Sequence, residues 1–235
     1  MTVSSDGPAT PSDGTTTPVT AGPRTQLLAI LACAELSAVE RLAEDATAAP
    51  SLADKVAVLS FARVQLDHYQ LLADQIVADG VDPIVAMEPF SGPLAEFHAH
   101  TTPRTWEERM IKIYVGDALA ADLYTELSSV LPAPLAELIR TVADDSDQRE
   151  FARARVVAAV DAEPQLSGRL ALWARRLVGE ALSQAQRIVS DNDHLAELLT
   201  GTEESTGLDL AATAEMFTRL IQRHNERMAK VGLRP

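Results

Sequence analysis

The strongest constraint on the fold of this chain is a succession of long segments in which apolar residues recur every three or four positions. In the first segment Leu27, Leu31, Ala38 and Leu42 fall on one stripe of a helix, and the later segments repeat this pattern. No segment alternates apolar and polar residues over any length, as a strand would. The pattern predicts an all-α protein with long helices over about 24–49, 52–78, 106–131 and 134–162, and further helices over about 167–190, 194–199 and 209–230.

These helices are expected to form a single domain that follows a tail. Residues 1–22 are rich in Ser, Thr, Pro, Gly and Asp and contain almost no large apolar residue, so we expect them to be disordered. Residues 23–235 then make one domain, with a core bundle over about 24–162 and accessory helices over about 165–232.

Two stretches between the helices have the composition of connections. Residues 81–105 are rich in proline and are predicted to be a long crossover with a short helix over about 93–98. Such a link carries the chain along the bundle before its third helix begins. Residues 201–207 are predicted to be a loop.

Charge and composition narrow the classes of function. The net charge is -14, from 20 Lys and Arg and 34 Asp and Glu. Nucleic-acid-binding proteins neutralise phosphates with clustered basic residues, so this acidity disfavours a nucleic-acid partner. No apolar run is long enough to span a bilayer, and no signal peptide is visible, so we expect a cytoplasmic protein. An arginine-rich strip on two predicted helices keeps a tRNA substrate open: Arg149, Arg153, Arg155, Arg169, Arg175 and Arg176.

Several polar residues interrupt the apolar stripes of the first four helices. Burial of a carboxylate without a partner is costly, so polar residues that face one core are expected to share a role. The first and third helices each offer one acid. The second and fourth each offer a pair three residues apart, which projects to one side of the helix. The residues are Glu35, then Gln65 with His68, then Asp117, then Asp145 with Gln148.

The order and spacing of these residues match the ligand set of a ferritin-like di-metal bundle. That set has a Glu from each of two helices and a Glu-x-x-His from each of the other two. Carboxylates bridge the two cations there, and the imidazoles supply nitrogen ligands. The candidate metal ligands are therefore Glu35, His68, Asp117 and Asp145, with Gln65, Gln148 and Asp122 as weaker candidates, the last in reserve for a rotated third helix.

Short stretches on four helices carry a family resemblance that covers about residues 25–232. They are Ala34-Glu35-Leu36-Ser37-Ala38, Gln65-Leu66-Asp67-His68-Tyr69, Tyr114-Val115-Gly116-Asp117 with Ala120-Ala121-Asp122-Leu123-Tyr124, and Gly179-Glu180-Ala181-Leu182-Ser183-Gln184. With them the chain resembles the MiaE-like group of ferritin-like proteins. The resemblance implies a ferritin-like four-helix bundle and a non-haem di-iron hydroxylase, similar to the enzyme that oxidises a methylthio-isopentenyl-adenosine in tRNA.

The chain departs from the family pattern at two ligand positions. The pattern implies Glu where this chain has Gln65, and His where it has Gln148. Glutamine is neutral, offers one carbonyl oxygen and bridges two cations poorly. Three carboxylates and one imidazole remain, a set that could hold one divalent metal, or two weakly. The expected cofactor is therefore one or two irons, or none.

Three functions follow from this reduced set. The first is an oxygen-dependent hydroxylase or oxidase with a degenerate iron site, acting on a small molecule or a modified nucleoside. The second is a non-catalytic ferritin-like binding or scaffold protein without metal. Its Gln65 and Gln148 would join a hydrogen-bonded polar core, with the carboxyl groups protonated or paired with Arg. Iron storage ranks third, because it needs a cage and an intact oxidation centre. A homodimer is the expected assembly.

Overall fold

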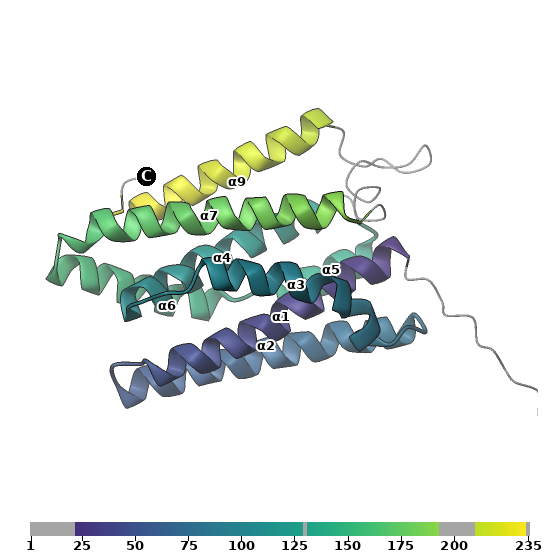
Figure 1. Cartoon of the computed structure of the whole chain (residues 1–235), viewed down its shortest axis with the longest axis horizontal. Coiled ribbons are helices and arrows are strands. Elements are labelled where there is room, and N and C mark those ends of the chain that lie inside the picture. Colours follow the sequence, from purple (N-terminus) through teal and green to yellow (C-terminus); the bar gives the residue numbers. More distant parts are fainter. Residues whose placement is uncertain (1–21, 129–130, 193–209, 234–235) are drawn as a thin grey trace, which may run out of the picture.

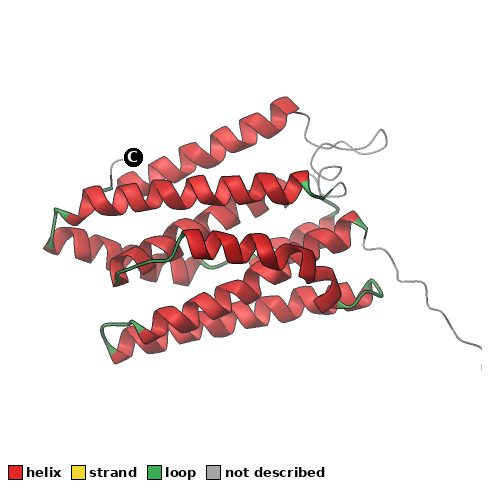
Figure 2. Cartoon of the chain, viewed as in Figure 1, coloured by secondary structure: helices red, strands yellow, loops and turns green. Residues whose placement is uncertain are grey.

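The computed structural model of the chain describes residues 22–128, 131–192 and 210–233. Figure 2 shows helices joined by short turns, with no strand in these segments, so the predicted all-α class is confirmed. The predicted tail (except Gly22), the short helix over 194–199 and the loop over 201–207 lie outside the described residues. The helices (Figure 1) are α1 (Pro23–Thr47), α2 (Leu52–Ala78), α3 (Pro83–His100), α4 (Trp106–Ser128), α5 (Ala133–Val142), α6 (Ser146–Ala162), α7 (Leu166–Ser190) and α9 (Leu210–Lys230).

The α1 and α2 helices form an antiparallel hairpin, with α2 on the outer edge of the molecule (Figure 1). Ser51 caps α2, because its Oγ accepts a hydrogen bond from the Asp54 backbone N–H at 3.0 Å. After Ala78 the chain turns at Gly80, whose φ of +79° suits a residue without a Cβ. Both ends of α2 agree with the sequence prediction.

The α3 helix corrects the prediction of a crossover that is mostly irregular. Residues Pro83–His100 are helical, not only 93–98. The Asp82 side chain caps the helix by accepting from the Ile84 N–H at 2.8 Å, and Pro83 suits a first helical position. Pro89 and Pro93 lie inside the helix and bring no N–H, and Figure 1 shows the ribbon bending after its first turns. The crossover role is nevertheless kept, since α4 runs in the same direction as α2 (Figure 1).

The predicted helix over 134–162 is in fact two helices, α5 and α6, separated at residues 143–145. Asp144 and Asp145 stand at the break, and the Asp144 carboxylate accepts from the Ser146 N–H at 3.4 Å. Aspartate competes with the helix for backbone N–H groups, which explains why the helix stops here. As a result Asp145 lies at the N-terminus of α6 and not in the middle of a helix.

The apolar core is divided into two clusters, and the candidate site lies between them. One cluster includes Leu28, Leu72 and Phe90, and the other includes Leu42 and Met110, all almost fully buried. Along α1, α2 and α4 the chain passes from one cluster to the other, and the polar candidates occupy the interval each time. The bundle therefore holds a polar layer between two apolar layers.

The last helices pack against α4. Arg219 and Arg223 of α9 pair with Glu126 of α4 at 2.7 and 2.9 Å, and Arg227 pairs with Asp122. Within the segments that the structure describes, no helix combines the length and the apolarity that a membrane span requires.

Candidate functional site

The polar residues predicted to share a site do converge. Glu35, Gln65, Asp117 and Asp145 line one cavity of about 160 Å³ among α1, α2, α4 and the α5–α6 turn. His68 is buried on α2, with its Nδ1 atom 3.9 Å from Oε2 of Glu35. Gln148 does not line the cavity, but its side chain contacts Asp117, which does.

The two glutamines at positions where the resemblance implies metal ligands, Gln65 and Gln148, are bound to the two aspartates. Nε2 of Gln65 donates to Oδ1 of Asp145 at 2.6 Å. Nε2 of Gln148 donates to Oδ2 of Asp117 in a short hydrogen bond. Both glutamines are buried. Each amide thus satisfies one oxygen of an aspartate, an oxygen that a metal ion would otherwise take.

Arg41 is a site residue that the sequence analysis missed. Its guanidinium lies 3.6 Å from Oδ1 of Asp117 and 3.6 Å from Oδ2 of Asp45, and its side chain is only 11% exposed. The signal was in the sequence, because Arg41 follows Ala34 and Ala38 at helical spacing and so belongs to the inward stripe of α1. The site therefore contains a fixed positive charge of its own.

Glu35 and His68 form the part of the site whose hydrogen bonding is incomplete. Both side chains are buried, and within the described part of the chain neither Oε2 of Glu35 nor Nδ1 of His68 has a hydrogen-bond partner. Their separation of 3.9 Å is too long for a direct hydrogen bond. A buried polar atom without a partner calls for an explanation, such as a bound group.

The acids of the site are held in an environment that disfavours their ionised forms. Burial, followed by the charges of Asp145 and Asp117, raises the pKa of Glu35 well above its usual range. Burial raises the pKa of Asp117 to about 7, against the opposing effect of Arg41. The pKa of Asp145 is also raised, mainly by burial. Burial is thus the main reason why the three carboxyl groups favour their protonated forms.

Two basic residues complete the wall on the side of α3 and α4. Nζ of Lys112 donates to the Thr101 carbonyl at 2.9 Å, and burial lowers the pKa of Lys112 to about 7. Burial lowers the pKa of His98 to about 3, so its imidazole is neutral at physiological pH. Both residues also line a second pocket of about 430 Å³ between α1, α3 and the start of α4. The inner cavity and the outer pocket share this wall.

The reserve candidate Asp122 lies elsewhere. Its carboxylate pairs with Arg227 and lies 3.9 Å from Arg223, both on α9, and it does not line the cavity. Its role in the structure is to join α4 to α9.

As the residues are placed, they do not fit a di-metal centre. Among the described parts of the chain, no three His, Cys, Asp or Glu side chains are arranged so that they could hold one metal ion together. Amides take one oxygen of Asp117 and one of Asp145, and Arg41 adds a positive charge where cations would sit. Among the described residues, Glu35, His68 and Gln148 of the predicted set each have a buried polar atom without a hydrogen-bond partner.

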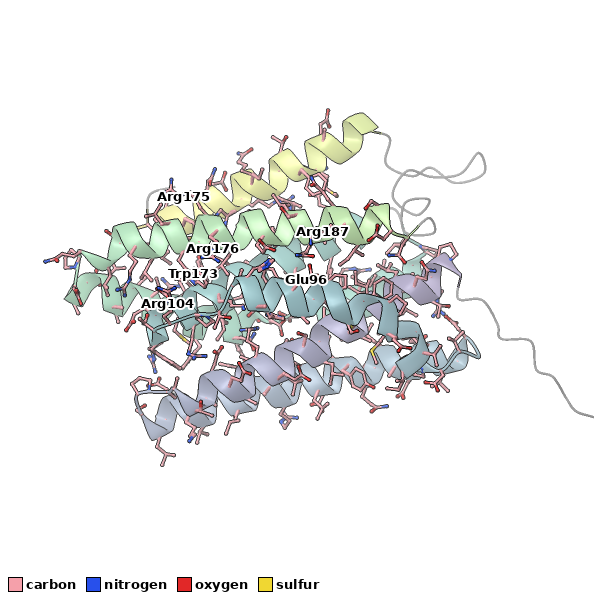
Figure 3. The ribbon with its side chains drawn as sticks, viewed as in Figure 1. Glu96, Arg104, Trp173, Arg175, Arg176 and Arg187 are labelled. Atoms are coloured by element: carbon pink, nitrogen blue, oxygen red, sulfur yellow. The ribbon has the colours of Figure 1, made fainter. Side chains whose placement is uncertain are left out.

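The arginine-rich strip is largely engaged in contacts within the molecule. Arg153 pairs with Glu150, Arg155 with Asp54, and Arg169 lies 3.9 Å from Glu108. Figure 3 shows Arg176 and Trp173 on the side of α7 that faces α3, whereas Arg175 points towards α9. Nη2 of Arg176 donates to the His100 carbonyl at 2.7 Å. These contacts compete with any use of the strip for phosphates.

Comparison with known proteins agrees with this architecture. The family model described as "Ferritin-like domain, actinomycetes" matches residues 23–202. No curated protein matches the chain. The match covers most of the described helices, including every candidate site residue on α1, α2, α4 and α6. The chain therefore belongs to the family of actinomycete ferritin-like domains.

Proposed function

We propose that this ferritin-like bundle works without a di-metal centre and binds a small organic molecule in the cavity beside Glu35. The observation that carries the proposal is the pairing of both aspartates with glutamine amides next to a buried arginine. In a metal site cations would neutralise the carboxylates, whereas here glutamine amides bind both aspartates and Arg41 lies beside Asp117. The protein would act in the cytoplasm as a homodimer.

The space beside the polar layer supports a ligand-binding role. The outer pocket of about 430 Å³ has the size of ordinary ligand sites, and it shares a wall with the smaller inner cavity of about 160 Å³. Leu94, Phe97 and Leu177 give the inner cavity an apolar side opposite the carboxyl groups. A few polar groups that converge on a largely apolar pocket are typical of small-molecule sites.

A second candidate is the hydroxylase implied by the MiaE-like resemblance, acting on a modified nucleoside or another small molecule through a single iron. The free Oε2 of Glu35 and Nδ1 of His68 favour it, because they are the atoms that a metal ion would bind. A bound iron would supply the oxygen chemistry. Glu35 and His68 would hold it, and Asp145 would have to release Gln65 to complete the set.

Metal content separates the two candidates. Purified without air in the presence of iron, the wild-type protein should hold only substoichiometric iron by mass spectrometry. The double variant Gln65→Glu, Gln148→His has the ligand types that the MiaE-like resemblance implies. It should bind more iron, because the two amides that now occupy the aspartates become metal ligands. Gln70→Glu, at an exposed position of α2, is the matched control and should change nothing.

Circular dichroism would verify that each variant is folded. Stoichiometric iron in the wild-type protein, lost on His68→Ala, would overturn the metal-free proposal in favour of the iron enzyme. No gain of iron in a folded double variant would show that the two glutamines are not what keeps metal out.

A further inference from the structure

We infer that the ligand of the inner cavity is a small organic ammonium ion, held by Glu35. This inference rests on the proposed ligand-binding function and names its chemical class. It starts from the carboxylate oxygen Oε2 of Glu35, a cavity-lining residue that is only 5% exposed. This oxygen has no hydrogen-bond partner among the residues that the structure describes. A buried acceptor of this kind requires a donor, and an ammonium group brings three.

A neighbouring oxygen atom also lacks a hydrogen-bond donor. Oε1 of Gln148, whose amide contacts Asp117 beside the cavity, is buried without a partner among the described residues, and an amide oxygen is always an acceptor. One donor, Nη1 of Arg41, is also without a hydrogen-bond partner there, but it lies 3.6 Å from Oδ2 of Asp45. A ligand that only accepts hydrogen bonds, such as a carboxylate, would leave Oε2 of Glu35 and Oε1 of Gln148 without a donor.

The balance of charge points in the same direction. Three acids line the cavity, Glu35, Asp117 and Asp145, against the two basic residues Arg41 and Lys112. Burial is the main cause of the raised pKa of each acid. Arg41 does not neutralise Glu35, because its guanidinium is shared between Asp45 and Asp117. Lys112 is held by the Thr101 carbonyl, on the wall towards α3. An added cation would neutralise Glu35 directly.

The aromatic and aliphatic residues that line the inner cavity suit the alkyl part of a small amine. Tyr124 and Phe97 both line the cavity, and aromatic faces attract ammonium groups. The Phe97 ring already has Nζ of Lys112 5.3 Å from its centroid, which leaves Tyr124 for the ligand. Leu94, Leu119 and Leu177 supply contacts for a short alkyl chain. A volume of about 160 Å³ is close to that of an engineered cavity that holds benzene, so a ligand of about six heavy atoms fits.

Calorimetry with three probes of equal size tests the inference. At pH 7.5, n-butylammonium should bind at least about tenfold more tightly than 1-butanol or butyrate, because charge-assisted hydrogen bonds exceed neutral ones by that much. Glu35→Gln keeps the volume and should abolish the preference for the ammonium probe. Glu88→Gln, at an exposed position of α3 outside both pockets, is the control and should keep the preference.

The outcomes separate this inference from the function on which it rests. Equal binding of the ammonium probe and the alcohol, or no loss in Glu35→Gln, would overturn the ammonium assignment and leave a ligand-binding cavity. Stoichiometric iron in a protein that binds none of the three probes would overturn the assignment and the proposed function together.

A separate observation concerns the outer face of α2, for which we propose antiparallel pairing with α2 of a second copy of the chain. Large apolar residues lie exposed at helical spacing along this face, where polar residues would be expected. Their exposed fractions range from 46% to 76%: Leu52, Val56, Leu59, Leu66 and Val77. We call this set the α2 stripe.

The charges beside the α2 stripe are arranged so that the helix complements itself. The exposed bases Lys55 and Arg63 lie in its first half, and the exposed acids Asp67 and Asp74 lie in its second half. Two antiparallel copies centred between residues 64 and 65 would bring Lys55 level with Asp74 of the second copy. Arg63 would be level with Leu66, and it pairs with Asp67 of its own helix at 2.6 Å. In the same register Leu52 is level with Val77. This is the self-complementarity that a two-fold symmetric interface requires.

Analytical ultracentrifugation tests the α2 pairing. The wild-type chain should sediment as a dimer at micromolar concentration, and Leu59→Lys with Leu66→Lys should convert it to a monomer. Lys55→Asp alone should weaken the dimer, and adding Asp74→Lys should restore it, because the cross-copy pairs are then exchanged. A wild-type monomer, or a dimer that survives the two lysines, would overturn the proposal.

Discussion

Replacement of Asp45 by alanine should lower the free energy of unfolding by about 3–5 kcal/mol, as measured by urea denaturation. The Asp45 side chain is 1% exposed and lies between two guanidinium groups. Nη1 of Arg109 is 2.5 Å from Oδ1 of Asp45, and Nη1 of Arg41 is 3.6 Å from Oδ2. Removal of the carboxylate leaves both cations without their common partner where water cannot fully replace it.

Two further variants show whether charge is the cause. Asp45→Asn keeps the shape and a carbonyl acceptor but removes the charge, so it should lie between the wild type and the alanine variant. Glu44→Ala, at the adjacent exposed position, should change the free energy of unfolding by less than about 0.5 kcal/mol. A cost below about 1 kcal/mol for Asp45→Ala would contradict the account, because it would mean that the arginines find other partners.

The helices that carry the site were predictable because their signals are local. Ser51 before α2 and Gly80 after it mark the two ends of that helix in the sequence, and the structure places both there. The apolar spacing along α1 and α4 likewise fixes the face that carries Glu35 and Asp117. These features depend on residues within one helical turn.

The predictions for residues 81–105 and 134–162 were both wrong about where a helix is interrupted. Prolines at 83, 89 and 93 suggested a mostly irregular crossover, yet the segment is helical, because Pro83 stands at the first position and Phe90 is buried in the core. Conversely, Asp144 and Asp145 lie within an otherwise helical pattern and break it. Propensity alone could not show that tertiary packing holds α3 and that side-chain hydrogen bonding interrupts the later helix.

The composition of the site was only partly predictable. Polar residues on apolar stripes indicated Glu35, Gln65 and Asp117, and the structure brings them to one cavity. Arg41 and Lys112 were missed, since long basic side chains at the border of a stripe can face either water or the core. Whether these two side chains face water or the core depends on the acids of other helices. A single sequence does not show which helices are neighbours.

Replacement of Asp117 by asparagine should make the protein more stable at pH 8, by up to about 4 kcal/mol, and leave it almost unchanged near pH 4. The pKa of Asp117 rises from 3.8 to about 7 on folding, mainly through burial. Between these values the folded chain binds a proton that the unfolded chain has lost, so wild-type stability falls as pH rises from about 4 to about 7. About three pKa units at about 1.4 kcal/mol each give the expected size. Asparagine keeps a carbonyl oxygen for Gln148 but has no charge to bury.

The measurement is urea denaturation of both proteins from pH 4 to pH 8, with Asp161→Asn, at an exposed position of α6, as the control. Lys112 does not mimic the effect, because burial lowers its pKa from 10.5 to about 7. Unfolded chains then bind the extra proton, so this lysine makes stability rise between about pH 7 and pH 10.5. A profile that falls towards pH 7 in the wild type and is flatter in Asp117→Asn thus belongs to the carboxyl group. Parallel profiles for the two proteins would show that Asp117 stays ionised throughout, with Arg41 as its counter-ion.

A cation held by Glu35, as inferred for the inner cavity, should reduce the difference in unfolding free energy between the two proteins at pH 8. The reason is that the cation stabilises the ionised acid that asparagine replaces.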